Sequence, residues 1–192
     1  MSKRPIQPRL IILSAPSGAG KSTLCRLLLD SYPNIVGSVS ATTRSPRSDE
    51  KEGVHYFFLD ETEFNRRIAA GEFVEWARVH EHLYGTPRNY VEECLAAGRH
   101  VLFDIDVQGA MNLKKQYPQR VLLIFVLPPS VEELRRRLRE RKTEDIRSIE
   151  TRMHNAYNEL AWKEKFQYQL INDDLEIAFQ NLRRIIEKEC QL

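Results

Sequence analysis

A glycine-rich stretch near the N-terminus has the residue types that bind phosphate. Its residues are Ala15, Pro16, Ser17, Gly18, Ala19, Gly20, Lys21, Ser22 and Thr23. In a Walker A loop, backbone N–H groups and a helix N-terminus surround phosphate oxygens, the lysine reaches the terminal phosphates and the next hydroxyl can hold Mg²⁺. The usual pattern begins with glycine, and Ala15 fits that position if its φ stays negative. The stretch therefore predicts a site for a nucleoside triphosphate.

Two carboxylates stand at the end of an apolar segment in the middle of the chain. Residues 101–105 are apolar except for Asp104, and Asp106 follows. P-loop proteins place a carboxylate near Mg²⁺ at the end of such a strand. Because the two acids are two residues apart, we expect them on one face of the strand. Asp104 would then face the metal, partly through water, and Asp106 would face a second ligand.

Arginines in two segments could neutralise phosphate charge, because guanidinium groups bind phosphate oxygens through paired hydrogen bonds. Arg44 and Arg47 flank Pro46 in the first segment. The second segment is helical in pattern and carries Arg135, Arg136, Arg137, Arg139, Arg141 and Arg152. Most of these are expected to form a solvated helix face, and spacing does not choose between Arg139 and Arg141 as a phosphate ligand.

The elements that must position these residues alternate between strand and helix. Apolar runs predict strands of a parallel sheet, covered on both faces, at residues 10–14, 101–105, 121–127 and 168–171. Helical spacing follows the glycine loop at residues 22–30. The pairs Ser130 with Glu133 and Asp60 with Glu63 predict helix N-termini. The last helix, after Asp174, should bury a face made of Leu175, Ala178, Phe179, Leu182 and Ile186.

The composition excludes several classes of protein. The chain has 192 residues, of which 42% are hydrophobic, and a formal net charge of +2, which is too small for a general nucleic-acid binder. Residues 121–127, the longest apolar run, are too few to cross a membrane, and the N-terminus lacks a secretory signal. We therefore expect a cytoplasmic protein without nucleic-acid or membrane partners, and leave a homo-oligomer open. The spacing of Cys25, Cys94 and Cys190 predicts reduced thiols in the core.

Seven segments, in this order, resemble motifs of the guanylate kinase family. They are residues 14–22, 40–47, 53–57, 73–76, 84–86, 104–109 and 172–175. The second and sixth segments are more specific than the glycine loop alone, and the likeness covers nearly all of the chain after its first nine residues. The resemblance implies an enzyme that uses Mg²⁺ and transfers the γ-phosphoryl group of ATP to GMP and dGMP, giving ADP and GDP in the case of GMP. It would serve purine nucleotide metabolism and GMP recycling.

The resemblance also implies roles for single residues. The implied catalytic residues are Lys21, Arg44, Arg141 and Arg152, the last two from a mobile lid. ATP would bind to residues 15–23 and, near the adenine, to Asn172. GMP would bind through Ser40, Arg44, Arg47, Tyr56 and Tyr84 at its phosphate and through Glu75, Thr86 and Asp106 at its base. The metal ligands would be Ser22 and Asp104.

The expected fold is α/β: a three-layer P-loop core with a parallel sheet, a small mixed α/β GMP-binding insertion and a helical lid. Glycine and proline punctuate short aromatic runs between residues 40 and 87, which is typical of such an insertion. The expected boundaries are a flexible tail at residues 1–9, core segments at 10–39, 89–132 and 161–192, a GMP-binding subdomain at 40–88 and a lid at 133–160.

The implied contacts agree with the chemistry of the substrates. Guanine presents N–H donors that Glu75 and Asp106 can accept, whereas adenine presents a lone pair at N1 that carboxylates repel. Leaving such polar groups unpaired discriminates by about 10⁴-fold. A general base is unnecessary because the attacking phosphate oxygen of GMP is already ionised. The insertion and the lid should close over the core to exclude water.

Other functions compete with this interpretation. Guanylate-kinase-like domains of scaffold proteins bind protein partners without catalysis, but they typically lack an intact phosphate loop. A kinase for another nucleoside monophosphate would have no use for Glu75 together with Asp106. A kinase that acts on a hydroxyl group would need a general base and would leave Arg44 and Arg47 without a role.

Overall fold

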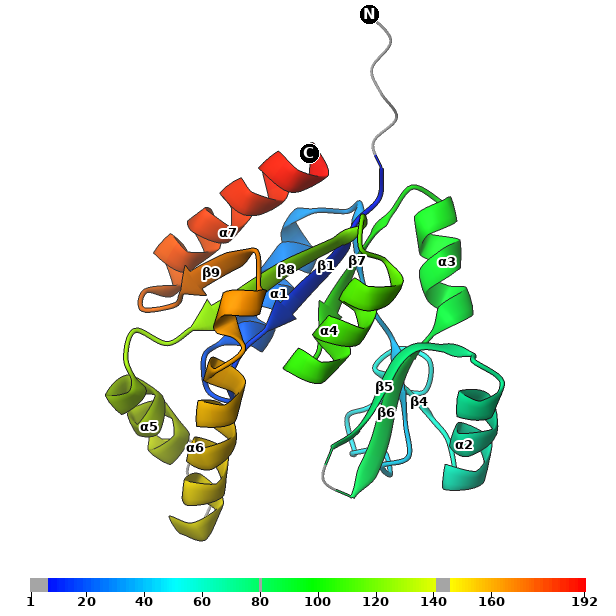
Figure 1. Cartoon of the computed structure of the whole chain (residues 1–192), viewed down its shortest axis with the longest axis horizontal. Helices are drawn as coiled ribbons and strands as arrows, with labels where there is room; N and C mark the ends of the chain where they lie inside the picture. Colours follow the sequence, from blue (N-terminus) through cyan, green and yellow to red (C-terminus); the bar gives the residue numbers. More distant parts are fainter. Residues whose placement is uncertain (1–6, 80, 141–145) are drawn as a thin grey trace, which may run out of the picture.

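The computed structural model of the chain describes residues 7–79, 81–140 and 146–192, with the side chains of residues 146–149 left aside. A central sheet has helices on both faces, and from one end of it a second, smaller sheet and a helix pair extend on opposite sides (Figure 1). The α/β class predicted from the motifs is confirmed. The predicted tail lies outside the described residues over residues 1–6, and so does Arg141.

The central sheet contains five parallel strands in the order β2-β7-β1-β8-β9. They are β1 (Leu10–Ser14), β2 (Ile35–Gly37), β7 (His100–Asp104), β8 (Val121–Leu127) and β9 (Tyr168–Ile171). Four of these strands were predicted from their apolar runs. The edge strand β2 was not, because three residues are too few for a recognisable pattern.

Helices cover both faces of this sheet and produce three layers. They are α1 (Lys21–Ser31) and α7 (Leu175–Cys190) on one face, and α3 (Arg88–Ala96) and α4 (Val107–Gln116) on the other. Alternate residues of each strand serve the two cores: Ile11 and Leu13 pack toward α1 and α7, whereas Leu10 and Ile12 pack toward α3 and α4. Burial on both faces explains why these strands are apolar without alternation.

The second sheet lies beside the carboxyl ends of the central strands, in the order β4-β3-β6-β5. Its strands are β3 (Ser40–Thr42), β4 (Tyr56–Phe58), β5 (Phe73–Val79) and β6 (His82–Pro87). Helix α2 (Glu61–Ala69) begins at Asp60, whose Oδ1 accepts a hydrogen bond from Glu63 N at 2.8 Å, as the sequence predicts. Phe64 of this helix stacks on Phe73 with ring centroids 4.6 Å apart, so the sheet and helix share a small separate core.

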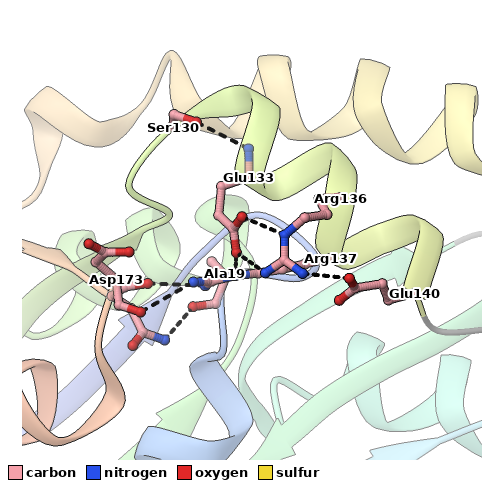
Figure 2. Close-up of polar contacts among 8 residues, drawn as sticks. Ala19, Ser130, Glu133, Arg136, Arg137, Glu140 and Asp173 are labelled. Carbon is pink, nitrogen blue, oxygen red and sulfur yellow. Dashed lines mark hydrogen bonds and ion pairs between the residues drawn. The ribbon is translucent and has the colours of Figure 1, made fainter.

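The helices α5 (Val131–Glu140) and α6 (Ile146–Leu160) form a pair on the other side of the central sheet, followed by the short helix η1 (Lys163–Lys165). Leu134, Leu138, Met153 and Ala156 are buried between them. The predicted cap of α5 is half formed: Ser130 Oγ accepts a hydrogen bond from Glu133 N at 3.1 Å. The Glu133 carboxylate accepts hydrogen bonds from arginines instead of completing the capping box (Figure 2).

Two local predictions were wrong. Asp106 does not lie on a strand with Asp104, because β7 ends at Asp104 and the Asp106 side chain caps α4, accepting a hydrogen bond from Gly109 N at 2.8 Å. Leu175 is 41% exposed. A helical side chain covers the turn that precedes it, and Leu175 is the first residue of α7, so it has no such turn to pack against the sheet.

The state of the cysteines agrees with the prediction from the sequence. All three cysteines are free and buried, as predicted. Burial raises the pKa of Cys25 and Cys190 to about 12 in each case, so both remain thiols at neutral pH. Within the described ranges, no helix combines the length and the apolar composition needed to cross a bilayer.

Candidate active site

The phosphate loop connects β1 to α1 and depends on two glycines with left-handed backbone. Gly18 has φ 94° and Gly20 has φ 88°, a region that L-residues rarely adopt. A Cβ on Gly20 would lie 2.2 Å from Nδ2 of Asn172. Among the described non-glycine residues, only Gln191 has a positive φ. Ala15 therefore has the negative φ that lets alanine replace the first glycine of the Walker A pattern.

Asn172 fixes the loop from the end of β9. Its side chain is buried, and its Nδ2 donates a hydrogen bond to Ala19 O at 2.8 Å. Arg137 of α5 binds the same segment, because its Nη1 donates to Asn172 O at 3.0 Å and its Nη2 to Asp173 O at 3.4 Å. Figure 2 shows Arg137 between Glu133 and Asp173, next to Ala19 of the loop. The helix pair is therefore attached directly to the loop region.

Lys21, Ser22 and Asp104 form the charged centre of the loop. The strand register pairs Leu13 with Asp104 and so brings the carboxylate beside the loop. Lys21 Nζ lies 2.5 Å from Asp104 Oδ1 and donates a hydrogen bond to Ile105 O at 3.2 Å. Ser22 Oγ donates to Asp104 Oδ2 at 3.1 Å. Lys21 thus lies next to Ser22 and Asp104, the two predicted metal ligands.

The donor set at Ser22 and Asp104 fits Mg²⁺, which prefers hydroxyl, carboxylate and water oxygens. In the described part of the chain, no cluster of three or more histidine, cysteine, aspartate or glutamate side chains could hold a metal. An ion bound by two protein oxygens must take its remaining ligands from water and phosphate.

A cavity of about 330 Å³ opens above the loop. Its lining includes most of the predicted ATP-binding loop, Asp104 and one carboxylate that the sequence did not indicate, Glu159 of α6. Burial raises the pKa of Glu159, opposed by the charge of Lys21 and by a hydrogen bond from the Ser17 backbone. Helix α6 therefore contributes directly to the phosphate site.

Arg44, Tyr56 and Tyr84 come together on the second sheet. The Arg44 Cζ atom lies 5.5 Å from the centroid of the Tyr56 ring, and the Tyr84 hydroxyl is a hydrogen-bond partner of the same guanidinium. The two tyrosine rings meet edge to face with centroids 6.1 Å apart. Arg44 also pairs with Glu50 at 2.7 Å, a contact that the sequence did not indicate.

Glu75, Thr86 and Asp106 also meet. Glu75 is 7% exposed, and its Oε1 accepts a hydrogen bond from Thr86 Oγ1 at 2.7 Å. The Thr86 hydroxyl lies 3.3 Å from Ser40 Oγ. A Cβ on Gly109 would lie 3.0 Å from Glu75 Oε2 and 3.3 Å from Asp106 Oδ1. Glycine at this position therefore leaves room for two neighbouring carboxylates.

The burial of Glu75 results from an irregularity in β5. Phe73, Val74 and Glu75 are buried in succession, which the alternation of a regular strand does not allow. The pairing register between β5 and β6 shifts between Phe73 and Glu75, and such a bulge redirects a side chain. Glu75 consequently stands opposite Thr86. Burial raises its pKa to about 7, and the nearby Asp106 contributes in the same direction.

Other predicted residues are less closely gathered. The Arg47 side chain is exposed, and its backbone N–H donates to Glu50 Oε2 at 2.8 Å. Arg152 lies on α6. Among the arginines of α5, Arg136 pairs with Glu133 and Glu140 at 2.7 and 2.5 Å and belongs to a solvated helix face. Helical spacing could not have identified Arg137 as the arginine that binds Asn172 and Asp173, because these partners come from a distant segment.

A glycine loop between a central parallel strand and its helix, with a carboxylate ending the adjacent strand, defines a P-loop nucleotide-binding protein. The family model for guanylate kinase matches residues 7–189. The chain belongs to the guanylate kinase family.

Relatives with similar sequences and a protein with a similar structure are also guanylate kinases. The chain is 46% identical to the guanylate kinase of Caldanaerobacter subterraneus, over 95% of this chain and 88% of the relative. It is 49% identical to that of Myxococcus xanthus, over 94% and 86%. Its fold is similar to the crystal structure of guanylate kinase from Anaplasma phagocytophilum, with a TM-score of 0.79, 35% identity and coverage of 97% and 88%.

Proposed function

We propose that this chain transfers the γ-phosphoryl group of ATP to GMP and dGMP through the residues described above. The observation that carries the assignment is the pair Glu75 and Asp106. Their carboxylates lie side by side next to Gly109, and Glu75 belongs to the sheet that also carries Tyr56 and Tyr84. Two hydrogen-bond acceptors suit the N1–H and N2–H₂ donors of guanine. Arg44, Tyr56 and Tyr84 suit the phosphate at the other end of GMP.

The donor site uses the phosphate loop and its charged centre. Backbone N–H groups of the loop and Lys21 Nζ would bind the ATP phosphates, and Ser22 with Asp104 would hold Mg²⁺, partly through water. When bound, the metal neutralises phosphate charge. Lys21 leaves its 2.5 Å contact with Asp104 to follow the phosphoryl group. Asn172 would contact the adenine of ATP.

The acceptor site orients an oxygen that is already a nucleophile. Arg44, Arg47, Tyr56, Tyr84 and Ser40 would bind the GMP phosphate, and no side chain has to remove a proton. Catalysis then depends on alignment of the two phosphates and on positive charge around the transferred group. Arg152, and Arg141 outside the described residues, would add charge from the lid.

The chain is divided in this proposal according to the roles of its segments. Residues 40–88 bind GMP, residues 133–160 form the lid, and residues 10–39, 89–132 and 161–192 form the core. The central strand β1 is fully buried and β8 is buried except at Leu127, whereas the two smaller units have separate cores. Such units can move as bodies when the substrates bind.

Substrate selection tests the guanine contacts. ADP release is measured with ATP and Mg²⁺ while GMP, dGMP, AMP, dTMP, CMP and UMP are each offered, with a reaction lacking any acceptor as control. We expect rapid turnover with GMP and dGMP alone. Preference for another base would overturn the roles of Glu75 and Asp106. Binding of GMP without any turnover would favour a protein-binding module of the scaffold type.

The Lys21→Ala variant tests the donor site. Removal of a cation that contacts the transition state should lower kcat by roughly 10²- to 10³-fold while the protein remains folded. Lys115→Ala is the matched control, because Lys115 is an exposed lysine of α4. Wild-type turnover by a correctly folded Lys21→Ala protein would refute the mechanism.

A further inference from the structure

Glu50 binds two of the residues that the proposed function assigns to the GMP phosphate. Arg44 Nη2 donates hydrogen bonds to Glu50 Oε1 at 2.7 Å and to Oε2 at 2.9 Å. The backbone N–H of Arg47 donates to Oε2 at 2.8 Å. One carboxylate therefore joins both ends of the Arg44–Arg47 segment.

This contact differs from a mobile surface ion pair. The side chains of Arg44 and Glu50 are only 16% and 11% exposed, and hydrogen bonds that involve a charged group are short and strong. Glu50 N donates to Arg47 O at 3.1 Å, so backbone and side chain of Glu50 close the same loop. The hydrogen bonds from Arg44 and Arg47 lower the pKa of Glu50, which keeps the acceptor ionised.

The Arg44 guanidinium is thereby held on several sides. Nη1 donates to Ser45 O at 2.7 Å, Nη2 binds Glu50, and the guanidinium faces the Tyr56 ring. A free arginine loses much rotamer entropy when it binds a phosphate, whereas a prepositioned one has already lost it. A guanidinium has five N–H donors, so donors on Nη1 and Nε remain to face Tyr84 and a phosphate.

We propose that Glu50 is a positioning residue of the acceptor site: it fixes the Arg44 guanidinium and the Arg47 backbone in the arrangement that binds the GMP phosphate, without touching GMP itself. The inference rests on the proposed function. A different role has the opposite consequence: if Glu50 occupied the place of the phosphate and had to leave, its removal would strengthen GMP binding.

The test compares Glu50→Gln with Glu52→Gln. Glu52 lies in the same loop and its Oε2 accepts a backbone hydrogen bond, from Phe58 N at 2.9 Å, but it contacts neither arginine. Loss of hydrogen bonds to a charged group corresponds to roughly 10- to 100-fold in affinity. We expect Glu50→Gln to raise KM for GMP by that factor, with KM for ATP within about twofold and with Glu52→Gln near wild type.

Two further measurements separate positioning from a general structural effect. The inhibition constant of guanosine, which lacks the phosphate, should be the same for wild type and Glu50→Gln. Glu50→Asp keeps the charge but shortens the side chain, and we expect it to raise KM for GMP as Glu50→Gln does. An unchanged or lower KM for GMP in both variants would overturn the proposal, as would an equal loss for guanosine. A wild-type protein that fails to phosphorylate GMP would instead refute the proposed function.

Discussion

At the scale of single residues, Glu75 shows how a binding requirement opposes stability. Its pKa is raised from an ordinary 4.5 to about 7, chiefly by burial. Between these two values the folded protein holds a proton that the unfolded chain has released. The stabilisation from this proton is complete below pH 4.5 and is lost as the pH rises through 7. Above pH 7 the folded protein therefore contains a buried carboxylate that destabilises it.

We predict that Glu75→Gln increases the free energy of unfolding at pH 8 by up to about 3 kcal/mol. The difference from wild type should shrink toward pH 5, where Glu75 is neutral in the folded protein. Urea denaturation at both pH values measures it, and Glu92→Gln, at an exposed position of α3, is the control. The same substitution should weaken the binding of GMP more than the binding of ATP. A stability difference that does not change with pH, or equal losses for both ligands, would contradict this account of Glu75.

At the scale of elements, prediction succeeded where the information is local in the sequence. The phosphate loop is recognisable from nine consecutive residues. The buried strands are recognisable from uninterrupted apolar runs, as in β8. The end of β7 was misplaced because an aspartate after an apolar run also serves as a helix cap, which is the role of Asp106. Hydrophobic alternation also could not reveal the bulge that buries Glu75.

Residues that act through distant partners were the ones missed. Glu159 reaches the phosphate loop from α6 and Arg137 reaches Asn172 from α5. Neither stands in a motif with the residues it contacts. Glu50 lies between the recognised segments 40–47 and 53–57, and the spacing of Arg44 and Arg47 does not indicate that one carboxylate joins them. These contacts depend on tertiary packing, which residue spacing does not contain.

The attachment of the phosphate loop to β9 gives a prediction for these elements. Alanine at Gly20 must adopt a left-handed φ and would displace the Asn172 side chain, which leaves Ala19 O without its buried partner. We expect Gly20→Ala to lower the free energy of unfolding by about 3 kcal/mol and to weaken ATP binding. Both are measurable, by urea denaturation and by titration calorimetry.

Gly98→Ala separates backbone strain from the lost contact. Gly98 also has a left-handed φ, 74°, but a Cβ there would meet nothing within 4 Å. This variant should lose only about 1 kcal/mol and should bind ATP normally. Equal losses of stability in the two variants would mean that Asn172 contributes nothing to the loop.

At the scale of the whole molecule, two smaller units with separate cores flank the central sheet. The second sheet and the α5–α6 pair extend from the same end of the central sheet, on opposite sides (Figure 1). Arg44 lies on one unit and Arg137 on the other, while Lys21 lies in the core between them. In-line transfer requires donor and acceptor phosphates in contact and water excluded. The proposed transfer therefore predicts that both units turn toward the core when both substrates are bound.

We predict that Mg·ADP together with GMP, a pair that cannot react forward, lowers the radius of gyration in small-angle scattering more than either ligand alone. Each ligand should draw in the unit that binds it, and the pair should draw in both. Mg·ADP with AMP is the control, since AMP offers its N1 lone pair to Glu75 and Asp106 and should leave the second sheet in place. If the radius is the same in these four conditions and without any ligand, the alignment of the phosphates must already exist in the free protein, and closure has no part in excluding water.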